Sequence, residues 1–149
     1  MSLYAESSAI LAWLLDEQPA VSVRELLAAQ QIVVTSDLTL MECERVLHRA
    51  VALGELTEAE AADRRAHLAT AAAHWTILRI SPEVVERARQ SFPGPPVRTV
   101  DAIHLASLLL ARSAISGLAL LSLDTRVRGA AAALGIQLQP QYAHAPKDN

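Results

Sequence analysis

Two residues that can bind a metal ion or move a proton lie three positions apart in the apolar segment VRTVDAIHLASLLLA at residues 97–111. They are Asp101 and His104. The segment has the composition of a helix, with the acid in its first turn. Positions i and i+3 of a helix lie on the same face, so both side chains should point the same way.

Three further acids each follow or open an apolar segment: Glu6, Glu42 and Asp124. Glu6 and Asp124 come just after expected strands, and Glu42 lies in the helix that follows another. In a parallel α/β sheet the ligand site lies beyond the carboxyl ends of the strands. We therefore expect Glu6, Glu42, Asp101 and Asp124 to converge at one end of the sheet.

Each of the four acids also has a simpler explanation. Glu6 fits a solvated turn residue, and Glu42 fits the last position of a capping box that begins at Thr39. Asp101 fits a charge that favours the positive end of the helix dipole, and Asp124 fits an N-cap of the next helix. The clustering of all four favours a shared site over four separate explanations.

A group of carboxylates points to a hard divalent cation, Mg²⁺ or Mn²⁺. Such ions prefer oxygen ligands and usually keep several waters, so one or two direct carboxylates are enough. Carboxylates that lie close together repel one another unless a cation neutralises them. A bound ion can generate hydroxide at neutral pH and stabilise charge on a phosphoryl oxygen.

The composition indicates one α/β domain, residues 1–142, with a polar tail at 143–149. The chain has 149 residues, is 52% hydrophobic and has a net charge of −3, so no basic excess indicates a nucleic-acid-binding protein. Its single cysteine excludes an internal disulfide and suits a reducing cytoplasm. No apolar run reaches the roughly 20 residues of a membrane helix, and the N-terminus lacks the basic region of a signal peptide.

Apolar periodicity predicts alternating strands and helices. The expected strands are residues 2–5, 32–35, 75–80, 118–122 and 136–138; the expected helices are 9–15, 20–30, about 36–53, 57–74, 82–90, 98–112 and 125–134. We expect Ser7 or Ser8 to cap the first helix, and Thr57 to open a capping box. The alternation favours a mostly parallel sheet of about five strands with helices on both faces.

Four segments resemble the motifs of the PIN-domain ribonucleases, specifically the VapC-like toxins of type II toxin–antitoxin pairs. They are YAESSAI at residues 4–10, TSDLTLMECERVL at 35–47, VRTVDAIHLASLLLA at 97–111 and LLSLDTRVRGAAAALGI at 120–136. The resemblance covers nearly the whole chain in order. The third and fourth segments are the more specific.

The resemblance implies a PIN-like fold and RNA cleavage by water activated on Mg²⁺ or Mn²⁺. It places Glu6, Glu42, Asp101 and Asp124 in the catalytic and metal-binding site. Ser8 and Ser122 would support that site or contact the substrate. It also implies a homodimer and a cognate antitoxin that crosses the active-site groove, with the apolar N-terminal helices as candidate contacts.

Other residues have weaker assignments. His104 fits a hydrogen-bonding residue beside the site better than a direct ligand of a hard ion. Arg98 fits either a phosphate contact or a solvated residue at a helix start. Cys43 lies on an apolar seam and fits the core, and the adjacent Arg64 and Arg65 fit a solvated helix face.

The first acidic position departs from the family pattern, because the family usually has Asp there and this chain has Glu6. An alternative function is therefore a PIN-like module that binds its partner without efficient catalysis. A phosphoacceptor receiver domain also gathers acids at strand ends, but it needs a lysine near a late strand. The only lysine of this chain is Lys147, in the tail, so we set that alternative aside.

Overall fold

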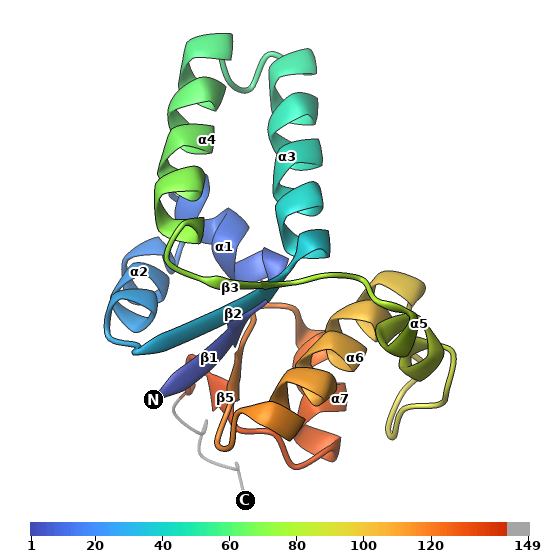
Figure 1. Ribbon diagram of the computed structural model, residues 1–149. Coiled ribbons are helices and arrows are strands. Elements are labelled where there is room, and N and C mark those ends of the chain that lie inside the picture. Colours follow the sequence, from blue (N-terminus) through green and yellow to red (C-terminus); the bar gives the residue numbers. More distant parts are fainter. Residues whose placement is uncertain (143–149) are drawn as a thin grey trace, which may run out of the picture.

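The protein is built on a five-stranded parallel sheet, which confirms the predicted α/β class. The computed structural model describes residues 1–142, so the predicted tail at 143–149 lies outside the described residues. The strands, in the order β3-β2-β1-β4-β5, all pair in parallel, and β1 lies at the centre (Figure 1). They are β1 (Ser2–Ala5), β2 (Ile32–Ser36), β3 (Thr76–Leu78), β4 (Ala119–Leu121) and β5 (Leu138–Gln139).

The central strand is buried on both faces. Leu3 and Ala5 pack into one hydrophobic cluster, and Tyr4 packs into the other. Successive side chains of a strand point to opposite faces, so β1 divides the core into two halves. This two-sided burial explains why its sequence is continuously apolar rather than alternating.

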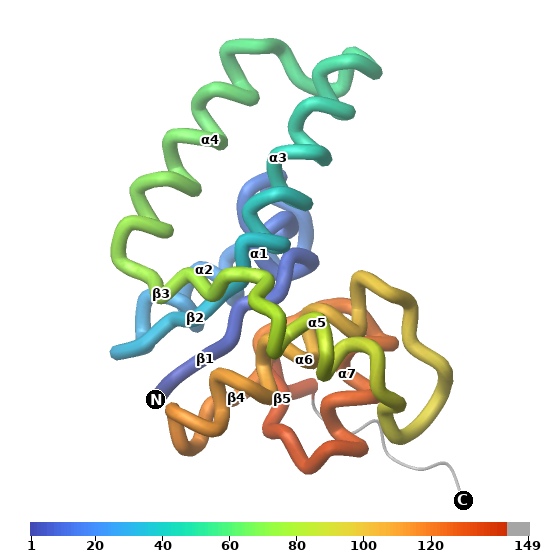
Figure 2. Tube along the Cα trace, turned by 45° about the vertical axis from the view of Figure 1, so that its right-hand side comes forward, coloured from blue at the N-terminus to red at the C-terminus, as the bar shows by residue number. Residues whose placement is uncertain are grey.

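Four helices contribute to the first half of the core: α1 (Ser7–Leu14), α2 (Ala20–Ala28), α3 (Asp37–Ala52) and α4 (Glu58–Ala72). The helices α3 and α4 form a hairpin that projects from the sheet in both views (Figures 1 and 2). Arg65 on α4 donates to the Glu44 carboxylate on α3 at 2.6 Å. The predicted capping box of α4 is confirmed, with Thr57 and Glu60 bonded reciprocally.

Three helices lie on the other side of the core: α5 (Pro82–Ala88), α6 (Thr99–Ala114) and α7 (Thr125–Ala133). Leu105 and Leu108 of α6 are fully buried against the Tyr4 face of the sheet. Within residues 1–142, no helix combines the length and apolar character needed to cross a membrane.

The predicted β3 was too long, because residues 75–80 shorten to Thr76–Leu78. This strand forms the edge of the sheet and pairs only with Val34–Ser36 of β2. Pairing partners rather than β propensity therefore decide its length. The last strand is also displaced, from the predicted 136–138 to Leu138–Gln139, because it pairs with Leu120 and Leu121.

Candidate active site

The carboxyl ends of β1 and β4 place two predicted site residues side by side. Glu6 follows the last residue of β1, and Ser122 follows the last residue of β4. The strands are parallel neighbours with Ala5 in register with Leu121. The hydroxyl of Ser122 therefore reaches the Glu6 carboxylate and donates to it at 2.7 Å.

Glu6 is a buried hydrogen-bond acceptor and not the solvated turn residue of the simpler explanation. Its side chain is the N-cap of α1 and accepts from the backbone amide of Ser8 at 3.1 Å. The Ser7 hydroxyl donates to it at 2.7 Å, and the hydroxyls of Ser8 and Ser122 also donate. The prediction that Ser7 or Ser8 would cap α1 was wrong, because Glu6 is the N-cap residue and its own side chain accepts from the Ser8 amide.

Glu42 comes from α3 and joins the same network. Its Oε2 accepts from the Ser7 hydroxyl at 2.9 Å, and its Oε1 lies 2.7 Å from Nε2 of His104. The capping box from Thr39 is wrong, because α3 begins at Asp37 and is capped by the Ser36 side chain. Glu42 therefore lies inside the helix, with its side chain 30% exposed.

A single hydroxyl joins the two carboxylates. Ser7 Oγ lies 2.7 Å from Glu6 Oε1 and 2.9 Å from Glu42 Oε2. A serine hydroxyl carries one proton, and an ionised carboxylate only accepts, so Ser7 can satisfy one of the two at a time. Two ionised carboxylates on the same hydroxyl repel each other, and a cation stabilises such a pair.

His104 links this pair to the core. Its side chain is 1% exposed, with Nε2 at 3.8 Å from Glu6 Oε1 and Nδ1 at 3.1 Å from the hydroxyl of Tyr4. Tyr4 is fully buried on β1. Burial raises the pKa of its phenol well above the ordinary value, so Tyr4 keeps its proton.

Asp124 caps α7, as its simpler explanation expected, by accepting from the amides of Arg126 at 2.8 Å and Val127 at 3.2 Å. Its backbone also belongs to the site, because its amide lies 3.1 Å from the hydroxyls of both Ser8 and Ser122. The cap therefore anchors the start of α7 beside Glu6.

Asp101 lies in the first turn of α6, one turn before His104. It is 9% exposed, and its carboxylate accepts from the backbone amide of Arg98 at 3.2 Å. Arg98 is the N-cap residue of α6 and is exposed. Asp101 therefore stabilises the positive end of the helix, and no hydrogen bond connects its carboxylate to Glu6 or Glu42 among the described residues.

The site contains mainly oxygen donors, which is the chemistry of a hard ion. Within residues 1–142, no three or more His, Cys, Asp or Glu side chains are disposed together to hold a metal ion. Mg²⁺ usually binds through one or two carboxylates and keeps its waters. The residues thus fit a hydrated ion beside Glu42 better than a closed protein cage.

Sequence reasoning assigned Ser7 only a capping role and missed Tyr4 entirely. A signal for Tyr4 was present, because positions i and i+2 of a strand face the same side and Tyr4 precedes Glu6 by two. The prediction for Cys43 is confirmed, since its side chain is fully buried in the cluster beneath α3. Burial first, and the charge of Glu42 second, raises the pKa of its thiol to about 12.

Comparisons with known proteins agree on the fold. The family described as PIN domain matches residues 3–133. No curated protein sequence matches the chain. Three solved structures similar to the chain are FitAcB from Neisseria gonorrhoeae, VapC20 from Mycobacterium tuberculosis, which is described as a sarcin-ricin loop cleaving toxin, and a toxin–antitoxin complex from Klebsiella pneumoniae.

The similarity of these structures extends over most of each chain. FitAcB has a TM-score of 0.68 at 18% identity, covering 93% of this chain and 96% of its own. VapC20 has a TM-score of 0.60 at 16% identity, covering 85% and 92%. The Klebsiella complex has a TM-score of 0.55 at 23% identity, covering 85% and 88%. At these identities the likeness establishes the fold.

Proposed function

Since the chain belongs to the PIN-domain family, we propose that it is a divalent-metal-dependent endoribonuclease that acts as the toxin of a toxin–antitoxin pair. The observation that carries the proposal is the Glu6–Ser7–Glu42 arrangement at the carboxyl edge of the sheet, where two carboxylates share one hydroxyl. Resemblance in four motifs and similarity to a toxin that cleaves the sarcin-ricin loop support it.

Mg²⁺ or Mn²⁺ would be held by Glu42 and Asp101, with Glu6 and Asp124 completing the acidic site. When bound, the ion would activate a water and neutralise charge on a phosphoryl oxygen. Glu6 already accepts hydrogen bonds from three hydroxyls and one amide. A direct bond from Glu6 to the ion therefore requires one of these donors to turn away, and Ser7 is free to turn to Glu42.

A basic surface next to Asp101 provides the RNA contact. A pocket of about 530 Å³ runs from α5 to the start of α6, and its rim carries Arg89 and Arg98. Of the described residues that line it, none is acidic. Arg126, at the start of α7, lines a smaller adjoining pocket. Arg89 is ion-paired with Glu86 at 3.6 Å. The exposed guanidinium groups of Arg98 and Arg126 can pair with phosphates on either side of a scissile bond.

Cleavage of a panel of structured RNAs, with Mn²⁺ or with EDTA, tests the activity. We expect cleavage with Mn²⁺ alone, and loss of it in Glu42→Gln. Glu44→Gln is the matched control, because Glu44 lies on the same helix but contacts Arg65 instead of the site. Cleavage that persists in EDTA, or that is equal in Glu42→Gln and the wild type, would refute the proposal.

The alternative is a PIN-like module that binds a partner without efficient catalysis. The observation that favours it is the Glu6 carboxylate, which is 4% exposed and turned toward the start of α1 by its hydrogen bonds. Tight Mn²⁺ binding without RNA cleavage would support this alternative. Glu6→Asp, which restores the usual family residue, should then increase cleavage.

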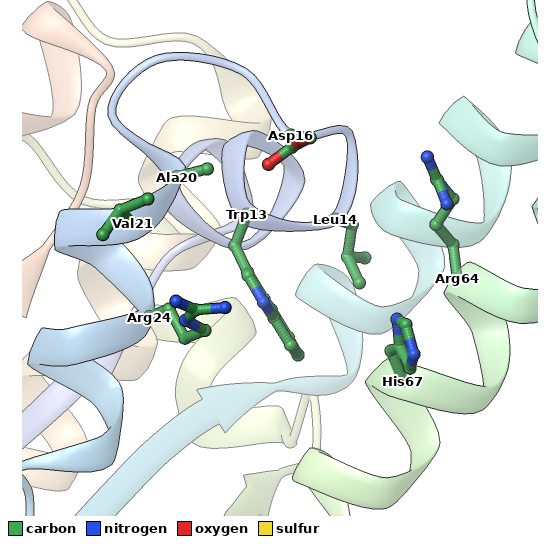
Figure 3. Close-up of a pocket in the computed structure, with 8 residues that line it drawn as sticks. All are labelled: Trp13, Leu14, Asp16, Ala20, Val21, Arg24, Arg64 and His67. Carbon is green, nitrogen blue, oxygen red and sulfur yellow. The ribbon is translucent and has the colours of Figure 1, made fainter.

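The antitoxin contact that we propose lies on the N-terminal helices. A pocket of about 230 Å³ opens between α1, α2 and α4 (Figure 3). The Trp13 ring extends into it between Arg24 on one side and His67 on the other, and Arg64 lies on the same helix as His67. Asp16 also lines the pocket and Asp63 pairs with Arg64 at 3.8 Å, whereas Arg24 forms no ion pair within residues 1–142. The Trp13 ring and Arg24 suit a partner segment that combines apolar and acidic side chains.

Co-expression with the protein of an adjacent reading frame tests this contact. We expect the wild-type chain to arrest growth and the adjacent protein to restore it. Arg24→Glu should weaken the complex by placing a like charge opposite the acidic partner. Arg49→Glu on α3 is the control, because Arg49 is exposed and lines a different pocket. Equal effects of both variants would exclude this pocket as the contact.

A homodimer is also proposed, through the apolar surface at the edge of the sheet. A pocket of about 360 Å³ is lined by Leu78 on β3, Val84 on α5 and Leu110 on α6. Leu110 is 36% exposed. Leu110→Glu should convert a dimer to a monomer in analytical ultracentrifugation, and an unchanged sedimentation coefficient would exclude this surface.

A further inference from the structure

A buried chain of hydrogen bonds leads from the core to Glu42. The Tyr4 hydroxyl lies 3.1 Å from Nδ1 of His104, and Nε2 of the same ring lies 2.7 Å from Glu42 Oε1. Tyr4 is fully buried on β1 and His104 is 1% exposed on α6. The chain thus joins three elements that are distant in sequence: β1, α6 and α3.

The partners at each end of His104 determine where its proton lies. An ionised carboxylate only accepts hydrogen bonds, so Nε2 must carry the proton that is donated to Glu42. A neutral imidazole then has an acceptor at Nδ1, which matches the phenol proton of Tyr4.

Glu42 needs such support because it has rotational freedom. Its side chain is 30% exposed, and it projects from the second turn of α3 rather than from a strand end. With Oε1 bonded to His104, the other oxygen Oε2 is directed to Ser7, beside Glu6. Without His104 the carboxylate is free to turn outward to water.

We infer that Tyr4 and His104 are positioning residues for the binding of a divalent cation. Tyr4 fixes the tautomer of His104 that is protonated on Nε2, and His104 in turn fixes the orientation of the Glu42 carboxylate. The role of the cation rests on the proposed function. Outer partners of this kind typically change metal affinity by about ten- to hundred-fold when removed. His104 thus acts as a hydrogen-bond donor to Glu42 and not as a metal ligand.

The tautomer is measured first, because it needs neither metal nor RNA. A long-range ¹H–¹⁵N spectrum of the full chain should show His104 protonated on Nε2. In Tyr4→Phe, which removes only the phenol oxygen, this tautomer should lose its preference. A His104 ring protonated on Nδ1 alone in the wild type would overturn the inference.

Mn²⁺ binding, measured by calorimetry without RNA, tests the effect on Glu42. His104→Leu should weaken Mn²⁺ binding by about ten- to hundred-fold, and His104→Gln should recover much of it, because the glutamine amide can donate from the position of Nε2. Leu108→Val is the matched control for packing, since Leu108 is fully buried one turn later on α6.

Three results separate the possible failures. Equal Mn²⁺ affinity of His104→Leu and the wild type, or equal losses in His104→Leu and Leu108→Val, would overturn the positioning role. If the wild-type protein binds no Mn²⁺, the role of His104 in cation binding is also overturned. A wild-type protein that binds Mn²⁺ and shows the expected order of variants but cleaves no RNA overturns only the proposed nuclease function.

Discussion

Replacing Asp101 with Asn separates a metal ligand from a residue that only stabilises its helix. The substitution keeps the shape of the side chain and an oxygen that can accept from the Arg98 amide, which lies 3.2 Å from the carboxylate. It removes one negative charge from a position that is 9% exposed at the positive end of α6. Both roles depend on that charge, but they predict different results.

The two roles differ in the magnitude and the metal dependence of the effect. Loss of a charge at a helix N-terminus costs about 0.3–1 kcal/mol of unfolding free energy, with or without Mn²⁺. A ligand at one hundred times its Kd stabilises a protein by about 2.7 kcal/mol, which raises the melting temperature of a chain of this size by roughly 8–10 °C. A hundred-fold weaker site retains only about 0.4 kcal/mol of this at the same Mn²⁺ concentration.

Thermal melts with Mn²⁺ or EDTA, run beside RNA cleavage, measure the difference. For a metal ligand, Asp101→Asn should lose most of the stabilisation by Mn²⁺ and most of the cleavage. In EDTA it should melt close to the wild type, because relief of repulsion among the acids offsets the lost helix-dipole contribution. Glu83→Gln is the control, since Glu83 is an exposed acid in the first turn of α5. A variant that gains as much stability from Mn²⁺ as the wild type, and still cleaves RNA, would refute the assignment.

Three further predictions follow from the packing. Cys43→Ala should leave RNA cleavage near the wild-type rate. The native Cys43 thiol should react slowly with maleimide at pH 8, because its pKa is raised to about 12. Since the folded state holds the thiol proton more tightly than the unfolded state, the free energy of unfolding should fall as the pH rises above 9, and it should fall less in Cys43→Ala. Leu105→Ala should lower the free energy of unfolding in urea by about 2–5 kcal/mol, because the side chain is fully buried. Arg128→Met removes donors to the carbonyls of Ser122, Gln139 and Pro140; it should lower that free energy by at least about 1.5–3 kcal/mol, and an unchanged urea midpoint would contradict the role of Arg128.

Much of the fold follows from local sequence patterns. The apolar run at residues 118–122 predicted β4, and Ser81-Pro82 predicted the start of α5 within one residue. The expected strands at residues 2–5 and 118–122 predicted that Glu6 would lie at the same edge of the sheet as the end of the fourth strand, and Glu6 is hydrogen-bonded to Ser122 there. These predictions succeed because hydrophobic periodicity and helix capping depend on residues close together in sequence, and because strands joined by a helix pair in parallel.

The site was predictable as a set of residue types but not as a set of contacts. Glu42 was predicted beside Glu6, yet the Ser7 hydroxyl that joins them was assigned only to capping. Whether an acid binds an ion or caps a helix depends on the donors around it. Asp124 illustrates this, because its carboxylate accepts from the amides of Arg126 and Val127 and so caps α7.

The sequence by itself determined the α/β class and predicted that Glu6 and Glu42 would lie beside each other. Only the tertiary structure decided that the Glu6 carboxylate turns toward three serines and that His104 connects Tyr4 to Glu42. The physical reason is range. Strand and helix patterns arise from neighbours in sequence. These hydrogen bonds instead join side chains from β1, α3, α6 and the end of β4 that lie up to 116 residues apart, so their rotamers depend on packing among distant elements.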